Sequence, residues 1–187
     1  MPKIRLACAT LLATCAIPVC VVAQDAPRPP GIDPYTETWV QVTGKYCWLY
    51  IYDAMGGSKA EWTGACKDGF VTGPGTATIH SGYSGTKVIF GNFTKGLFNG
   101  HAVVDVILDG VHTRLEVDDA ESGRTGGQGT INRDSAGQKI FEYTGQIRGT
   151  YPQGQGHGVL YDPQSGAVVA DYTGQWIGGK PADAKPK

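Results

Sequence analysis

Glycine recurs in this chain at a fixed spacing, and this feature limits the possible folds more than any other. Segments that open alike begin at residues 62, 89, 116, 143 and 172, so they lie 27, 27, 27 and 29 residues apart. The first segment carries Gly64, Gly69, Gly73 and Gly75, and the second repeats them 27 residues later except that Ala102 replaces the last. Such a period is the signature of a repeat architecture, in which neighbouring units bury each other's apolar faces.

Each unit has the pattern of a β-hairpin. A short apolar run follows each glycine pair, and a turn signal and a returning run come next. Asp109-Gly110 is the strongest of these signals, since Asp-Gly suits a two-residue hairpin turn. In the third unit Glu116 and Asp118 stand where the aromatic residue and first glycine are expected. In the fourth unit the glycines are Gly154, Gly156 and Gly158, and two inserted residues are needed to keep register.

The fold class predicted is therefore all-β: a single-layer, antiparallel, twisted sheet of about five tandem hairpins. We expect some glycines to take positive φ at the connections and others to leave room for an aromatic ring against the backbone. Rings at the first and fifth position of the units are expected to stack between neighbouring units. A strand over residues 35–42 is expected to cap the N-terminal end of the sheet.

This pattern resembles the MORN repeat family, whose motif is roughly Y-x-G-x-W-x-x-G-x-x-x-G-x-G. The resemblance covers about Lys45 to Lys180, and the first, fourth and fifth units match best. It implies stacked MORN-type hairpins and a role in anchoring or assembly through protein or lipid contacts. The segment containing Cys47 and Cys66 is also similar to exported bacterial members, in which a cysteine pair brackets the first repeat.

Four regions are predicted along the chain. Residues 1–23 form a cleaved signal peptide, because Lys3 and Arg5 precede an apolar run that ends in a small residue. A retained anchor and a lipid attached at Cys15 are the alternatives for this segment. Residues 24–34 form a proline-rich linker, 35–179 the MORN-type β-repeat domain, and 180–187 a disordered tail. The protein is therefore expected in the periplasm or outside the cell.

Loss of residues 1–23 changes both the charge and the cysteine count. Of 16 basic residues, 14 remain against 17 acidic ones, a net charge of −3. That balance predicts no nucleic-acid partner and makes lipid an unattractive one. Cys47 and Cys66 remain as a pair, which favours one disulfide in an oxidising compartment, and the alternative is a two-cysteine metal site.

Motifs that carry catalysis are missing from the sequence, which has no H-E-x-x-H, G-x-S-x-G or Walker loop. The histidines His101 and His157 occupy the same repeat position, which is typical of a solvated framework. An acidic cluster of Glu116, Asp118, Asp119 and Glu121 suggests a solvated turn, with a weak cation site as the alternative. We expect no enzymatic activity, no cofactor and no metal.

Aromatic residues are the candidate binding residues. On the predicted sheet they form either the core between units or a surface that binds a peptide or a sugar chain. They are Trp48, Trp62, Phe93, Tyr143, Tyr172 and Trp176. The functional prediction is a non-enzymatic scaffold that binds an envelope protein, with a module for cell-wall glycan or peptidoglycan as the alternative. Self-association through the open sheet edges, giving a homodimer, is a further expectation.

Overall fold

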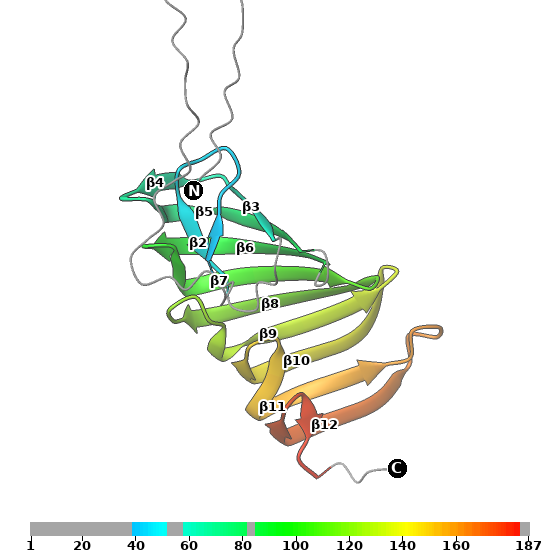
Figure 1. Cartoon of the computed structure of the whole chain (residues 1–187). Coiled ribbons are helices and arrows are strands. Elements are labelled where there is room, and N and C mark those ends of the chain that lie inside the picture. The colour runs from blue at the N-terminus through cyan, green and yellow to red at the C-terminus, as the bar shows by residue number, and fades with distance from the viewer. Residues whose placement is uncertain (1–38, 52–57, 82–84, 184–187) are drawn as a thin grey trace, which may run out of the picture.

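The structure is a computed structural model that describes residues 39–51, 58–81 and 85–183. The signal peptide, the linker, residues 35–38 of the predicted cap and residues 184–187 of the tail lie outside the described residues. The described chain forms one open, mostly antiparallel sheet of 13 strands (Figure 1). The strands are β1 Trp39–Gln41, β2 Trp48–Tyr50, β3 Lys59–Trp62, β4 Ala65–Lys67, β5 Phe70–Ser81, β6 Gly85–Thr94, β7 Leu97–Leu108, β8 Val111–Ala120, β9 Gly126–Ser135, β10 Gln138–Arg148, β11 Tyr151–Tyr161, β12 Val168–Ile177 and β13 Lys180–Pro181.

Strands β5 to β12 pair in chain order, each antiparallel to the next, so the predicted all-β antiparallel sheet is confirmed. Strand β2 departs from this order, because it pairs with β5 in parallel through Trp48 and Phe70. The sheet twists from β4 at one end to β12 at the other (Figure 1).

Glycine turns join the strands. Both turn residues have positive φ at Asp109–Gly110, as the sequence predicts, and at Asp68–Gly69, Lys95–Gly96, Ser122–Gly123 and Ala136–Gly137. That pair of angles suits the right-handed twist of two-residue hairpins. The connections at residues 68–69, 95–96, 122–123, 149–150 and 178–179 all lie on one side of the sheet, which we call the turn edge.

One row of paired residues crosses the whole sheet and defines its buried face. The row consists of Trp62, Ala77, Ile89, Val104, Leu115, Ile131, Tyr143, Gly158 and Tyr172. All of these except Tyr172 are buried. The opposite face, which carries the side chains of Asp105, His112 and Arg114, is called the polar face.

This row corrects the sequence alignment in the third unit. Leu115 occupies the aromatic position and Val117 the first glycine position, whereas Glu116 and Asp118 were expected there. The reason is a bulge in β8, since Gly100 pairs with Ala120 but Ala102 pairs with Val117. One extra residue between Val117 and Ala120 restores the spacing and sends the acidic side chains to the polar face.

The fourth unit also needs a correction. Gly145 pairs with Gly156, as Gly91 pairs with Ala102 in the second unit, so no insertion separates the two glycines. The extra length lies in the connection 162–167 between β11 and β12. His157 consequently lies two residues beyond the counterpart of His101, and the two histidines do not share a repeat position.

Aromatic rings pack edge to face between neighbouring units. Trp62 lies 4.7 Å from Phe93, and Tyr143 lies 5.3 Å from Trp176, measured between ring centroids. Each pair joins the first position of one unit to the fifth position of the next, as predicted, with T-shaped instead of parallel geometry. A Cβ added at Gly156 would lie within 2.6 Å of three Tyr143 atoms, so the ring occupies the space that glycine leaves.

Strands β1 and β2 form a hairpin that lies against the turn edge at the first strands of the sheet (Figure 1). The amides of Trp48 and Tyr50 donate 2.9 Å hydrogen bonds to the carbonyls of Gly69 and Gly96. A disulfide joins Cys47 to Cys66, with the Cα atoms 5.9 Å apart, as predicted. The N-terminal cap therefore consists of two strands tied covalently to β4.

The C-terminal boundary differs from the prediction. Lys180–Pro181, assigned from sequence to a disordered tail, form β13 and pair with Ile177 and Trp176. The amide of Ala182 also donates to the carbonyl of Gln175. The two-glycine turn at Gly178–Gly179 brings this segment back onto the sheet.

Candidate functional site

The predicted aromatic binding residues belong mostly to the core. Trp62, Phe93, Tyr143 and Trp176 are at most 4% exposed. Their polar atoms point inward too: Trp62 Nε1 donates to the Ala65 carbonyl at 2.8 Å, and Tyr143 Oη donates to the Gln146 carbonyl at 2.9 Å. A binding role for these four residues stays a prediction, and little of their surface is open to a partner.

The other two candidates are partly accessible. Trp48 and Tyr172 have intermediate burial, on β2 and β12, at opposite ends of the sheet. Tyr172 packs edge to face on Trp176 with 5.5 Å between ring centroids. The structure therefore does not bring the six predicted residues into one surface.

A groove on the buried face is a candidate site in the described chain. Its volume is about 440 Å³. The floor is apolar and comes from the buried row and its neighbours, with Ile89, Phe98, Val104 and Leu115. Ile51, just past the end of β2, closes one side.

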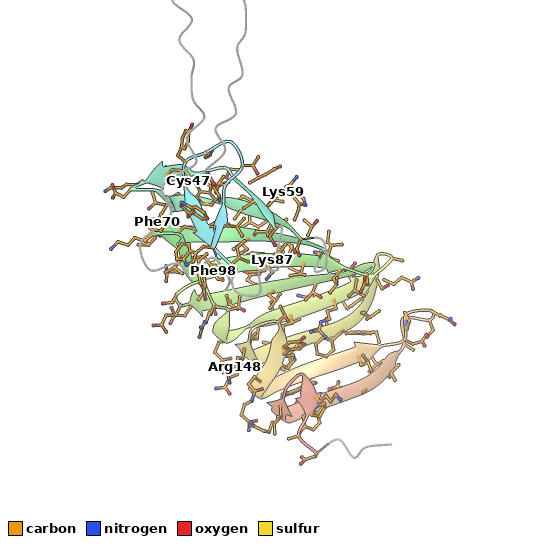
Figure 2. The ribbon with its side chains drawn as sticks, in the orientation of Figure 1. Cys47, Lys59, Phe70, Lys87, Phe98 and Arg148 are labelled. Atoms are coloured by element: carbon orange, nitrogen blue, oxygen red, sulfur yellow. A yellow bond between two sulfur atoms is a disulfide. The ribbon has the colours of Figure 1, made fainter. Side chains whose placement is uncertain are left out.

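Three successive connections of the turn edge form the other side of this groove. These connections and the strand residues that flank them contribute Gly123, Arg124, Thr125, Arg148, Gly149, Thr150, Tyr151, Gln153 and Gly178. Lys87 also lines the groove, and Figure 2 labels it together with Phe98 and Arg148. The described lining residues thus include three cationic side chains and no carboxylate.

Backbone hydrogen bonds hold the wall of the groove in place. The Gly123 amide donates to the Phe98 carbonyl, and the Gly149 amide donates to the Thr125 carbonyl, both at 3.0 Å. Thr125 Oγ1 donates to the Gly149 carbonyl at 2.7 Å, and Arg133 donates to the Thr150 carbonyl at 2.9 Å. Desolvation lowers the pKa of Arg133, which still supplies a fixed positive charge beneath the wall. Successive turns are therefore linked into one preformed surface.

Sequence reasoning missed this site, although one signal for it exists. One residue directly follows each connection of the turn edge. In chain order these residues are Phe70, Leu97, Arg124, Tyr151 and Lys180. The first of these lies under the N-terminal hairpin, because the Phe70 ring is 5.6 Å from Trp39. Arg124 and Tyr151 line the groove instead, and Tyr151 is 55% exposed. The change from apolar to polar along this column marks where the cap ends.

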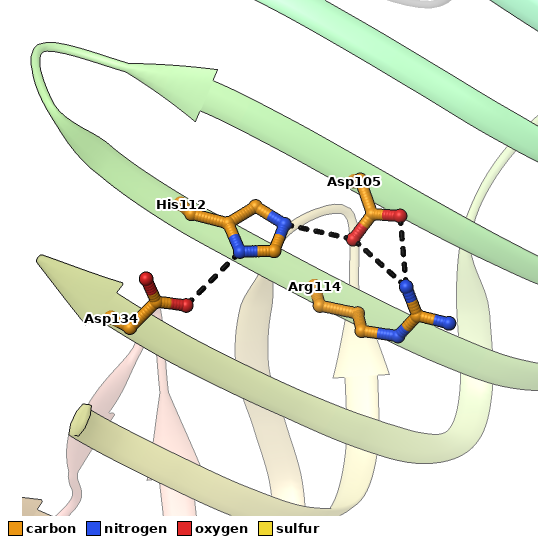
Figure 3. Close-up of polar contacts among 4 residues, drawn as sticks. All are labelled: Asp105, His112, Arg114 and Asp134. Carbon is orange, nitrogen blue, oxygen red and sulfur yellow. Dashed lines mark hydrogen bonds and ion pairs between the residues drawn. The ribbon is translucent and has the colours of Figure 1, made fainter. Parts of the chain in front are cut away.

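The polar face carries a histidine held between two carboxylates. His112 on β8 lies 2.9 Å from Asp105 of β7 through Nε2 and 3.0 Å from Asp134 of β9 through Nδ1 (Figure 3). Arg114 adds a second cation on Asp105 at 3.0 Å. Ionised carboxylates only accept hydrogen bonds, so both ring nitrogens donate when the ring is protonated, and the pair of carboxylates favours the imidazolium. The hydrogen bond to Asp105 is the main cause that raises the pKa of His112.

The remaining histidines also lie on the polar face, beside acceptors. His101 approaches Glu116 and Asp118 at 3.6 and 3.8 Å, and His157 lies 2.8 Å from Asp171. A hydrogen bond from Lys139, and then one from the Tyr161 hydroxyl, lowers the pKa of Glu142. The histidine contacts and the Tyr161–Glu142 bond cross from strand to strand, so they hold the sheet together on its solvated side, whereas Lys139 and Glu142 both lie on β10.

Within the described residues no group of three or more histidine, cysteine or acidic side chains has the arrangement of a metal site. Within the same residues no helix is long and apolar enough to cross a membrane. Comparisons with protein-family models, with curated proteins and with solved structures give no match.

Proposed function

We propose that this protein is a non-enzymatic scaffold, built from about five tandem MORN-type hairpins, that holds a segment of another protein in the groove. The observation that carries the proposal is the groove itself: an apolar floor, a rigid wall of linked turns and a rim with Arg148 and Tyr151. Binding sites in proteins combine an apolar surface with a few fixed polar groups in this way. The described lining residues include cations and no carboxylate, which favours an acidic partner segment.

Two further observations support the repeat assignment and the location. The connections on the turn edge recur every 27 residues up to Gly149–Thr150, and rings pack between units at matching positions. The disulfide between Cys47 and Cys66 is compatible with an oxidising compartment outside the cytoplasm. We therefore place the scaffold in the periplasm or outside the cell.

A test uses crosslinking pull-down from a cell-envelope extract, with bound proteins identified by mass spectrometry. Tyr151→Ala and Arg148→Glu alter the rim of the groove without touching the core. We expect Tyr151→Ala to weaken a saturable partner about tenfold or more, since an aromatic anchor in an interface contributes on the order of 2 kcal/mol. Substitutions at Trp62 or Tyr143 are unsuitable, because both rings are buried and their loss would disturb the fold.

Matched controls lie outside the groove. The exposed fraction of Tyr46 is 56% and that of Tyr151 is 55%, so Tyr46→Ala removes an equally accessible ring. Lys67→Glu reverses an exposed charge on β4. Both controls should retain the partner. Equal capture by Tyr151→Ala, Arg148→Glu and the controls would overturn the proposal.

A glycan or peptidoglycan ligand is the second candidate. The observation in its favour is the exposed Tyr151 ring beside Gln153 and Thr150, since a tyrosine and neighbouring hydrogen-bonding groups suit a sugar ring. Retention on insoluble cell wall, lost in Tyr151→Ala and kept in Tyr46→Ala, with no protein in the eluate, would replace the scaffold by this function.

A further inference from the structure

The edge strands at the two ends of the sheet are covered by other segments to different extents. At the first end the chain covers β3, because Val42 forms a parallel bridge with Ala60 and the Thr43 amide donates to the Ala60 carbonyl at 2.7 Å. At the last end β13 pairs only with Trp176 and Ile177 of β12, and Ala182 adds one bond to Gln175. In the described chain, residues 168–174 of β12 pair with β11 alone.

Strand β12 also lacks the features that prevent an edge strand from pairing with another chain. Natural edges are blunted by lysine, proline or an inward charge. Residues 168–177 contain no lysine and no proline, and their one charge, Asp171, is bound to His157 at 2.8 Å. Val168 and Val169 are 58% and 61% exposed, and Leu160 on β11 is 45% exposed. A strand whose outer edge is unpaired, beside exposed apolar side chains, is a surface to which another strand can add.

We propose that two copies of this chain associate by antiparallel pairing of their β12 edges, which continues the sheet from one copy into the other. A second copy fits because, across a two-fold axis, the backbone amides and carbonyls of one β12 edge face the carbonyls and amides of the same edge in the other copy. The pairing leaves the groove of each copy open, so it is independent of the scaffold function.

The backbone fixes the register of this pairing. The carbonyl of Gln175 points outward, since it accepts from Ala182, and alternation along a strand then directs the amides and carbonyls of Thr173 and Asp171 outward. A two-fold axis at Asp171 would place two carboxylates opposite each other. An axis at Thr173 would need the Gln175 carbonyl, which is already bound. The axis at Tyr172 remains, and it pairs Asp171 with Thr173 of the second copy.

This register also places compatible side chains together. On the buried face, Tyr172 meets Tyr172 of the second copy, and Ala170 meets Gly174 of that copy. On the polar face, each Asp171 carboxylate meets a threonine hydroxyl. Opposite residues in such a pair have Cβ atoms about 4.5 to 5.5 Å apart, which allows direct contact. The ladder ends where Ala182 occupies the edge.

Sedimentation of the full chain across a concentration series tests the association. We expect the mass to double with concentration. Thr173→Pro should abolish the doubling, because proline removes an outward donor while the bonds to β11 remain. Thr173→Val keeps the donor and should dimerise like the wild type. Far-UV circular dichroism and thermal melting establish that the proline variant is folded.

Cysteine crosslinking tests the register. In a chain with Cys8, Cys15 and Cys20 changed to serine, oxidised Tyr172→Cys should form a covalent dimer, since opposite residues approach to disulfide distance. Asp171→Cys is the matched control and should not, because its counterpart in the second copy lies diagonally across the axis. A monomer at every concentration, a dimer that survives Thr173→Pro, or crosslinking through Asp171→Cys would overturn the proposal.

Discussion

Replacement of Gly75 by alanine tests how the sheet accommodates its aromatic rings. A Cβ at Gly75 would lie within 2.7 Å of the Cη2, Cζ2 and Cζ3 atoms of Trp62, closer than side-chain atoms pack. The φ angle at Gly75 is not positive, so the effect is steric and not conformational. The indole must move, and that movement weakens its contact with Phe93 and its 2.8 Å hydrogen bond to Ala65.

The magnitude follows from these losses. Overpacking of a buried site costs about 1 to 3 kcal/mol, and a lost hydrogen bond costs about 1 kcal/mol. Alanine lowers the entropy of the unfolded chain, which offsets about 0.5 kcal/mol. We expect Gly75→Ala to reduce the free energy of unfolding by about 2 to 3 kcal/mol, measured by urea denaturation followed through tryptophan fluorescence.

Gly91 provides the matched control, because it pairs directly with Gly75 on the neighbouring strand. The residue at the first position of its unit is Ile89, and a Cβ at Gly91 would meet only atoms at 3.5 Å or more. Gly91→Ala should be neutral or stabilise by about 0.5 kcal/mol. In a Trp62→Ile background, Gly75→Ala should lose most of its cost. Equal shifts for Gly75→Ala and Gly91→Ala would refute the reasoning.

Two other perturbations give distinct results. Replacing Cys47 and Cys66 by serine opens a loop with a sequence separation of 19, so the free energy of unfolding should fall by about 3 kcal/mol, and an unchanged denaturation midpoint would contradict this. The pKa of His112 is raised in the folded state. Protonated His112 therefore contributes its full stabilisation at pH values below the unfolded pKa of about 6.5, and this contribution is lost as the pH rises through the folded pKa. His112→Gln should therefore destabilise the protein at acidic pH and have little effect at pH values well above the folded pKa, and an equal effect at both would argue against the imidazolium between Asp105 and Asp134.

The candidate site shows how far sequence reasoning reaches. The sequence left two roles open for Trp62, Phe93, Tyr143 and Trp176, because a ring that packs between units and a ring that binds a ligand have the same spacing. Burial separates the two, and it is decided by what covers each ring. Arg148 and Tyr151 were missed because they flank a turn, where spacing carries no information about a shared surface.

The sequence by itself determined the all-β class, the two-residue turns such as Asp109–Gly110, the glycines beneath the rings and the cysteine pair. All of these depend on local backbone preferences or on contacts between neighbouring units. The tertiary structure alone decided the bulge that puts Leu115 in the buried row and the fold of the N-terminal hairpin onto the turn edge. It also decided that residues 168–174 of β12 form an open edge among the residues that the structure describes. The physical reason is that a one-residue shift in pairing moves every side chain to the other face, and such shifts depend on how whole strands pack.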